Sequence, residues 1–167
     1  PVCGADLVST GPGEWIVLED NLRMPGGLAM AVALRDRIVE GYPEFAARSE
    51  VHDPRAGLEM LARTLRAAAP EGVDDPEIAV VVAEDELQAF DLIHAAEAVG
   101  AAVVTPEVLV CAEGRVYRDD DEGRHRVDVL YVRMDEEMLL SAEGSNGARL
   151  RGGLLDAMAT SAVAVVN

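Results

Sequence analysis

The chain has 167 residues, half of them hydrophobic, and a formal net charge of −17. The hydrophobic content excludes a disordered tail, and the length suffices for one domain with a core, or for one domain plus a piece of another. The acidic charge argues against nucleic acid as a partner, because phosphate binding needs a basic surface. All 14 basic residues are arginine, so the chain has no lysine to form a Schiff base or to hold a phosphate in a P-loop.

The apolar residues and cysteines indicate where in the cell the protein is expected. No apolar run approaches the roughly 20 residues that a spanning helix needs, so no membrane is expected as a partner. The two cysteines, Cys3 and Cys111, do not form a disulfide framework. No signal peptide is visible, and a cytoplasmic location fits. Because the chain begins at Pro1 and ends at Asn167, directly after a strand-like run, both ends are expected to be cut from a longer polypeptide.

The first segment is predicted to be a hairpin followed by two helices. Residues 5–8 and 14–19 flank Gly11-Pro12-Gly13, a strong turn signal. Residues 28–39 are apolar nearly all round as far as Arg35, which predicts a buried helix. Residues 55–69 carry leucines on one stripe and predict a second helix. A linker rich in Pro, Asp and Gly at residues 70–77 then divides the chain into segments 1–76 and 77–167.

The second segment has the alternation of an open α/β sheet. Strands are predicted at 78–83, 101–105, 108–112, 115–118, 127–133 and 163–166, and helices at 85–99 and 154–161, with Asp85 as the first cap. The apolar runs 78–83 and 127–132 are predicted to be interior strands of a mainly parallel, Rossmann-like sheet. The Gly-rich dinucleotide fingerprint is missing. The acidic run 119–122 predicts a solvated hairpin tip, since a calcium loop would need an acid where Leu130 stands.

Three oxygen-bearing residues of the first hairpin are predicted to share one face. Glu19 and Asn21 are two apart on a strand, and a turn centred on Pro12 and Gly13 places Asp6 opposite Glu19. Carboxylate and amide oxygens suit Mg²⁺, which usually takes one or two carboxylates plus substrate phosphates. Spacing alone favours a plain solvent-facing strand edge over a metal site.

The same stretch resembles the metal-binding end of ATP-grasp ligases, whose pattern is an Asp on one strand and Glu-x-Asn on the next. The run Leu18-Glu19-Asp20-Asn21-Leu22-Arg23 is similar to circularly permuted ATP-grasp ligases in particular, whose relatives include glutathionylspermidine synthetase-like proteins. In these the late part of the grasp fold precedes a Rossmann-like pre-grasp domain. Weaker similarities continue at residues 128–135 and 153–167.

The resemblance implies a fold, cofactors and an activity. Residues 1–76 would be a late ATP-grasp segment and residues 77–167 an α/β pre-ATP-grasp domain with a Rossmann-like sheet. Asp6, Glu19 and Asn21 would hold the magnesium ions that bind the ATP phosphates. The reaction would join a carboxylate to an amine through an acyl phosphate, with small-molecule or peptide substrates. The lysines that hold ATP in this family would lie in the remainder of the ATP-grasp fold, so the chain alone is expected to be inactive.

Two arginines are candidates for contact with a substrate. Arg23 follows Asn21 by two and could bind a carboxylate or acyl phosphate as a fork, or pair with Asp20 or Glu19 instead. Arg133 ends an apolar strand, where open α/β sheets bind ligands. Its alternative is an ion pair with Asp135 or Glu136.

Two other classes of protein remain open. One is a non-catalytic relative of ATP-grasp proteins that uses the fold for protein contacts; three intact ligand positions argue against it. The other is a small-molecule-binding α/β domain unrelated to ligases. Flanking sequence with lysine-bearing strands would favour the ligase.

Overall fold

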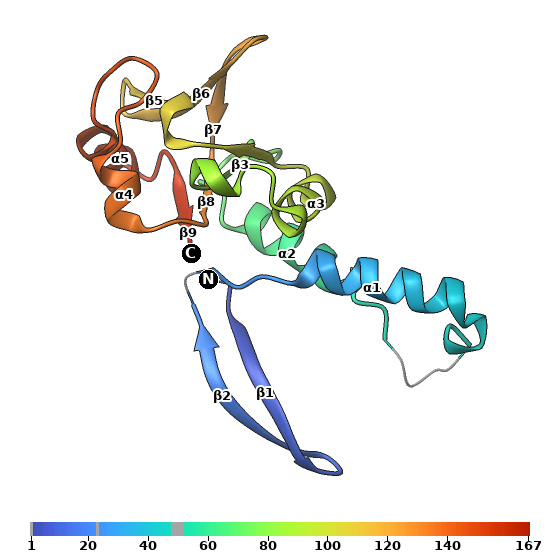
Figure 1. The fold of residues 1–167 in the computed structure, drawn as a ribbon. Coiled ribbons are helices and arrows are strands. Elements are labelled where there is room, and N and C mark those ends of the chain that lie inside the picture. The colour runs from blue at the N-terminus through green and yellow to red at the C-terminus, as the bar shows by residue number, and fades with distance from the viewer. Residues whose placement is uncertain (1, 23, 48–51) are drawn as a thin grey trace.

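The chain folds around a four-stranded parallel sheet in the computed structural model, which describes residues 2–22, 24–47 and 52–167 (Figure 1). The strands of this sheet, in the spatial order β4-β3-β8-β9, are β4 (Ala102–Val104), β3 (Ile78–Val81), β8 (Val129–Val132) and β9 (Ala164–Val166). The antiparallel strands are β1 (Gly4–Gly11) paired with β2 (Glu14–Asn21), and β5 (Leu109–Ala112), β6 (Arg115–Asp120) and β7 (Gly123–Val127) in a second sheet. The α-helices are α1 (Leu28–Gly41), α2 (Arg55–Ala67), α3 (Phe90–Val99), α4 (Glu136–Ser141) and α5 (Leu150–Ala159).

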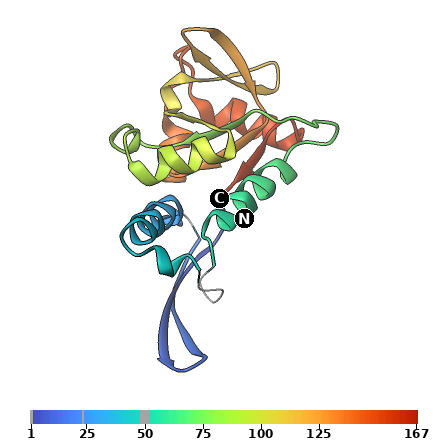
Figure 2. The ribbon, with the colours of Figure 1, turned by 90° about the vertical axis from the view of Figure 1, so that its right-hand side faces the viewer.

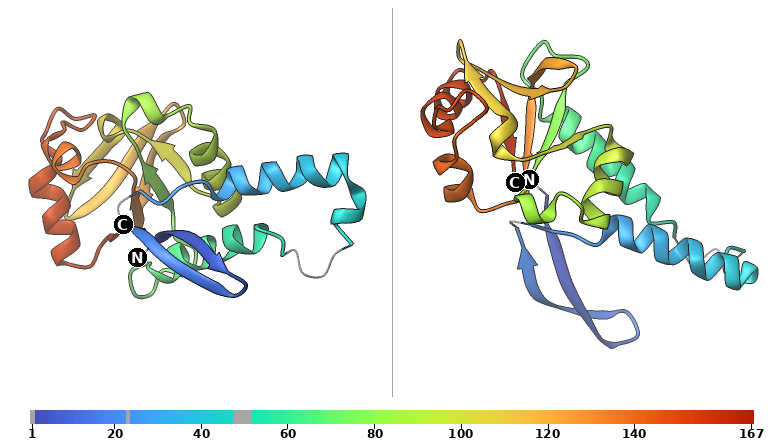
Figure 3. Two further views of the ribbon diagram at one scale, coloured as in Figure 1. Left: turned by 60° about the horizontal axis from the view of Figure 1, so that its bottom comes forward. Right: turned by 45° about the horizontal axis from the view of Figure 1, so that its top comes forward.

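Both faces of the parallel sheet are covered, so the molecule has two core clusters. On one face Ile78 and Val80 pack with Leu65 of α2 and residues of α3. On the other, Ala79 and Val81 pack with α4, α5 and the antiparallel sheet. Figure 3 shows the strands between α4 and α5 on one side and α3 on the other. Every residue of β3 is buried, as expected of a strand covered on both faces.

The mixed α/β fold and the interior position of two strands are confirmed. β3 lies between β4 and β8, and β8 lies between β3 and β9, with parallel pairing throughout. Helix α2 falls within the predicted segment 1–76, yet its Ala62 and Leu65 belong to the core of the sheet. The Rossmann-like description and the division at residue 77 stay predictions.

The single strand predicted at 127–133 is wrong, because the chain divides at Asp128. β7 ends at Val127 in the antiparallel sheet, and β8 begins at Val129 in the parallel one. The Asp128 carboxylate accepts a hydrogen bond from Glu77 N–H at 3.1 Å, and the Asp128 N–H donates to Glu77 O at 2.9 Å. These hydrogen bonds hold Asp128 in place between β7 and β8, where the chain passes from one sheet to the other.

Two helix predictions also need correction. Asp85 does not cap a helix running to Val99: Glu84–Glu86 form one 3₁₀ turn, Ala89 is extended, and α3 begins at Phe90. The side chains of Leu87 and Ala89 pack against the core there, which interrupts a continuous helix. Helix α1 is not buried, since Ala29 is its one buried residue. It extends from the body and packs against α2 and α3, while Met30 and Leu34 on it are exposed (Figure 1).

The hairpin β1–β2 projects from the body at the end opposite the antiparallel sheet β5–β7 (Figure 2). Its strands contact each other, and their apolar side chains remain exposed to solvent. Trp15 has 64% and Leu18 has 68% of its surface exposed. No helix in the described parts of the chain is long and apolar enough to cross a membrane.

Candidate functional site

The register of the hairpin depends on two irregularities that cancel. Pro12 and Gly13 form the turn, and Gly13 takes a φ of 77°, which glycine adopts without strain. Next to the turn Gly11 pairs with Glu14, but a shift at Thr10 then brings Ser9 opposite Trp15. A second shift, at Leu18 on the other strand, restores the original register beyond it. One bulge on each strand therefore returns the base of the hairpin to the pairing of a simple two-residue turn.

The restored register pairs Asp6 with Glu19, which confirms the predicted pairing. Asn21 pairs with Gly4 at the base of the hairpin, two residues beyond Glu19, and alternation along the strand puts it on the same face. All three residues are exposed. Asn21 Oδ1 also accepts a hydrogen bond from Met24 N–H at 3.1 Å, where the chain turns out of β2.

The donor set fits a magnesium ion. Among the described residues, no ion pair or hydrogen bond engages the side chain of Asp6 or Glu19, so two adjacent carboxylates keep their oxygens available. Opposite residues of an antiparallel pair have Cβ atoms about 5 Å apart, and a cation between them would relieve their repulsion. No group of three or more His, Cys, Asp and Glu suited to a metal occurs in the described part of the chain. Two carboxylates, one amide oxygen and nucleotide phosphates would complete the coordination of Mg²⁺.

Of the two candidate arginines, Arg133 can be placed, whereas Arg23 lies outside the described residues. The Arg133 Nη1 donates to Pro25 O and, at 3.1 Å, to Tyr131 Oη. Its guanidinium also lies over the Tyr131 ring, 5.6 Å from the centroid. In the described part of the chain Arg133 forms no ion pair with Asp135 or Glu136. It lies at the carboxyl end of β8 and contacts the segment that leaves the hairpin.

A cavity of about 350 Å³ lies between the base of the hairpin, α2, α3 and the sheet. Its walls are mostly apolar, and its polar groups include Asp91 and Arg133. Asp91 accepts hydrogen bonds from Gly27 N–H at 2.8 Å and Met30 N–H at 3.0 Å, and so caps the start of α1 from α3. Sequence reasoning missed this role of Asp91, because nothing local links it to a helix more than 60 residues earlier.

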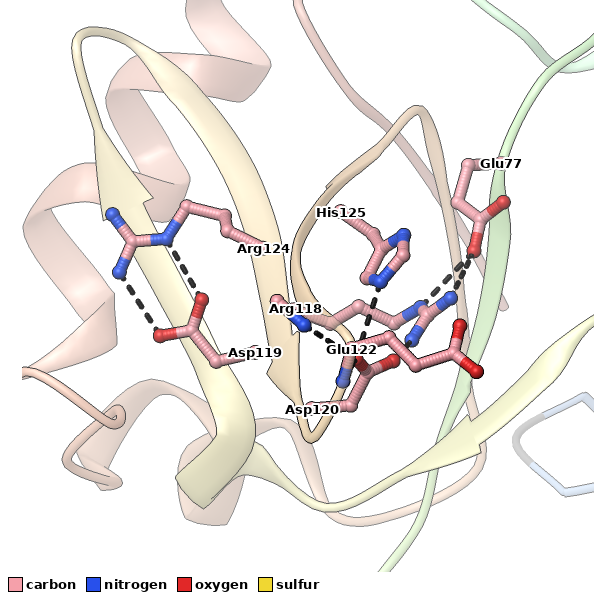
Figure 4. A network of polar contacts seen from close by, with 8 residues as sticks. Glu77, Arg118, Asp119, Asp120, Glu122, Arg124 and His125 are labelled. Atoms are coloured by element: carbon pink, nitrogen blue, oxygen red, sulfur yellow. Dashed lines mark hydrogen bonds and ion pairs between the residues drawn. The ribbon is translucent and has the colours of Figure 1, made fainter.

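A polar network joins residues of β6 and β7 (Figure 4), in the sheet at the end of the body opposite the hairpin (Figure 2). Arg118 donates to Glu77 Oε1 at 2.8 Å and also pairs with Asp120. Asp119 pairs with Arg124 at 2.7 Å, and hydrogen bonds from Arg124 and Ser145 lower the pKa of Asp119 to about 2. Asp119 and Asp120 of the predicted solvated hairpin tip are therefore paired with arginines, and the ion pairs of this network connect β6 to β7 and to Glu77.

A fold in which a carboxylate-bearing hairpin precedes a parallel α/β sheet is the arrangement expected of a permuted ATP-grasp protein. The family model for circularly permuted ATP-grasp type 2 matches residues 1–167. The chain belongs to this family. Membership argues against the alternative of a small-molecule-binding α/β domain unrelated to ligases.

Similar proteins come from several bacteria. The chain is 40% identical over 166 residues to a Frankia alni protein named "Putative glutamate--cysteine ligase 2-3", covering 98% of this chain and 19% of that protein. It is 39% identical over 169 residues to "Putative glutamate--cysteine ligase 2-2" of Frankia casuarinae, covering 99% of this chain and 20% of that protein. An uncharacterized protein of Synechocystis is 30% identical over 139 residues, which cover 83% of this chain and 29% of the relative. The chain thus spans about a fifth of the two Frankia relatives.

Proposed function

We propose that the chain is part of an ATP-dependent carboxylate–amine ligase that works through an acyl phosphate. The observation that carries the proposal is the Asp6–Glu19 pair, with Asn21 on the same face, in a chain of the circularly permuted ATP-grasp type 2 family. The names of the two Frankia relatives support a ligase that forms an amide bond between amino acids.

The three hairpin residues would hold the metal of an Mg-ATP complex. Bound Mg²⁺ neutralises phosphate charge and orients the transferred group. Asp6 and Glu19 would each supply a carboxylate oxygen, and Asn21 an amide oxygen whose second lone pair remains beside its bond to Met24 N–H. These side chains bind and position; none of them needs to move a proton.

The rest of the machinery would come from the remainder of the ATP-grasp fold, outside this chain. The hairpin supports this, because a two-stranded ribbon with exposed apolar side chains on both faces is marginally stable alone. Leu7 and Val17 form one exposed apolar pair, and Val8 and Ile16 form the next. Strands or helices that cover these pairs would also bring the lysines that this chain lacks.

The substrate contacts stay predictions. A fork by Arg23 or Arg133 would bind the carboxylate or acyl phosphate; for Arg133, Nη1 is engaged by Pro25 and Tyr131, which leaves Nη2 for an anion. A specificity like that of glutathionylspermidine synthetase is untested, and the named relatives point to glutamate and cysteine instead. A non-catalytic interaction module is the alternative.

The test replaces Glu19 by Gln in the full-length protein. This removes a metal-binding charge with little change in shape, and an exposed substitution of this kind usually costs less than about 0.5 kcal/mol of stability. We expect magnesium-dependent conversion of ATP to ADP to fall at least about 100-fold, as for loss of a positioned charge in phosphoryl transfer. Melting temperature checks the fold.

The matched control is Glu14→Gln, the same chemical change on the same strand but at the turn. Asp20→Asn adds a second control, since Asp20 lies one residue from Glu19 and so on the opposite face. Both variants should keep wild-type turnover. Equal turnover by folded Glu19→Gln and wild-type proteins would show that Glu19 is not a metal ligand, and the proposal would lose its main support.

A further inference from the structure

The side-chain amide of Asn167 joins the two strands of the β1–β2 hairpin at the end away from its turn. Asn167 directly follows β9, at the carboxyl edge of the parallel sheet. Its Oδ1 accepts a hydrogen bond from Val2 N–H at 3.2 Å, and its Nδ2 donates to Leu22 O. A single carboxamide therefore bridges the chain that enters β1 and the chain that leaves β2.

This bridge continues the hydrogen-bond ladder of the hairpin. The last backbone pair is Gly4 with Asn21, so Val2 and Leu22 lie just beyond it. A carboxamide offers one acceptor oxygen and N–H donors, as a peptide group does, and can take the place of a further rung. Because Asn167 directly follows β9, the rung also ties the direction of the hairpin to the sheet.

The exit from the hairpin is held at the neighbouring strand. Arg133, directly after β8, donates to Pro25 O. Asp91 fixes the next turn through Gly27 N–H and Met30 N–H. β8 and β9 are adjacent and parallel, so Asn167 and Arg133 lie at one edge of the sheet, the edge where open α/β sheets bind ligands.

We propose that Asn167 is a positioning residue for the reaction, which holds the hairpin so that Asp6 and Glu19 meet Mg-ATP at the carboxyl edge of the sheet. The proposal rests on the function proposed above. Asp6 and Glu19 are two rungs from Gly4 and Asn21, or about 7 Å along the strand. A tilt at the root would displace both carboxylates, and because Mg²⁺ demands near-ideal coordination geometry, the displacement should weaken its binding.

The experiment uses Asn167→Ala in the full-length protein, which removes both hydrogen bonds of the bridge. The first readout is amide hydrogen exchange. Loss of the bridge should raise exchange at residues 4–6 and 19–21 by about ten-fold, while β3 and β8 keep their protection. Asn146→Ala is the matched control: Asn146 is exposed in a turn and makes a local bond to Ala148 N–H at 3.0 Å, far from the hairpin.

The second readout is ATP turnover against Mg²⁺ concentration. A misplaced ligand pair should raise the half-saturating Mg²⁺ concentration by about ten-fold, with less than about three-fold change in kcat at saturation. A purely structural defect would lower kcat and melting temperature together and leave the Mg²⁺ dependence unchanged. The control Asn146→Ala should match the wild type in both readouts.

Two results would overturn the proposal. Unchanged exchange at the hairpin root would show that the amide does not hold it. Raised exchange with an unchanged Mg²⁺ dependence would show that the bridge does not position the ligands. Failure of the proposed function is distinguishable, because it appears as full turnover by Glu19→Gln, whatever the exchange data show.

Discussion

Asp128 is the one buried charged residue in the described part of the chain, with 5% of its surface exposed. It accepts from Glu77 N–H, and its Oδ1 forms an ion pair with Arg126 Nη2 at 2.6 Å. A buried carboxylate is costly unless it is paired and hydrogen-bonded. Here the pairing occurs where the chain passes from β7 of the antiparallel sheet to β8 of the parallel sheet, so Asp128 stabilises that junction.

Asp128→Ala should therefore destabilise the protein. The change leaves Glu77 N–H without its side-chain acceptor and Arg126 without its partner, which should lower the free energy of unfolding by about 2–4 kcal/mol. Asp128→Asn keeps the shape and one acceptor oxygen and should cost about half as much. Urea unfolding followed by circular dichroism measures both. The exposed Asp121→Ala serves as control, and a loss no larger than in this control would contradict the role given to Asp128.

Among individual residues, the contacts that could be predicted from the sequence are those set by local geometry. Asp6 and Glu19 could be paired because a turn signal lay between them, although the real register passes through two bulges that no pattern revealed. Asn167 and Asp91 act on segments far away in sequence. No local period predicts such contacts, and they follow only from the assembled sheet.

The elements of the α/β body were more predictable than those of the first segment. A continuous apolar run is a direct sign of a strand covered on both faces, which is why β3 and most of β8 could be located. Helix α4 was missed, since its six residues are too few for a periodic pattern. Its start depends on the Asp135 side chain, which accepts from Glu137 N–H and Met138 N–H.

Helix α1 and the hairpin show why burial could not be read from apolar content. Both carry large apolar side chains, and both leave them exposed, such as Leu34 on α1 and Ile16 on β2. An apolar helix is expected inside a core. The chain spans about a fifth of its Frankia relatives, and the surfaces that we propose to cover these side chains lie in the remaining four-fifths.

The hairpin should thus differ in stability between the isolated chain and the full-length protein. In the isolated chain, amides of residues 5–19 should exchange nearly as fast as in an unfolded peptide, because a two-stranded ribbon is marginal in water. β3 and β8, inside the sheet, should be protected. In the full-length protein the hairpin should gain about 100-fold or more in protection. Equal protection of the hairpin in both forms, read by mass spectrometry, would contradict a covering partner.

At the scale of the whole molecule, charge decides what the chain can do with a nucleotide. It carries −17 and has no lysine. Its ion pairs engage much of the arginine charge, for example Arg118 with Glu77 and Asp120. The Asp6 and Glu19 carboxylates, which we propose to bind a metal, would repel free phosphate. Salt screens the long-range repulsion beyond about 8 Å at physiological ionic strength, so the missing cations near the phosphates matter most.

The isolated chain should consequently bind Mg-ATP weakly and convert no ATP to ADP. The full-length protein should bind Mg-ATP and convert it to ADP. Phosphoryl transfer depends on cationic groups that hold the phosphates in line, and the ligands that we propose in this chain, Asp6, Glu19 and Asn21, bring no positive charge. Calorimetric titration with Mg-ATP and a coupled ADP assay, on both proteins under the same conditions, measure the difference. Hydrogen exchange at β3 and β8 verifies that the isolated chain is folded. ATP turnover by the folded chain, lost in its own Glu19→Gln variant, would show that the hairpin and sheet suffice without lysine.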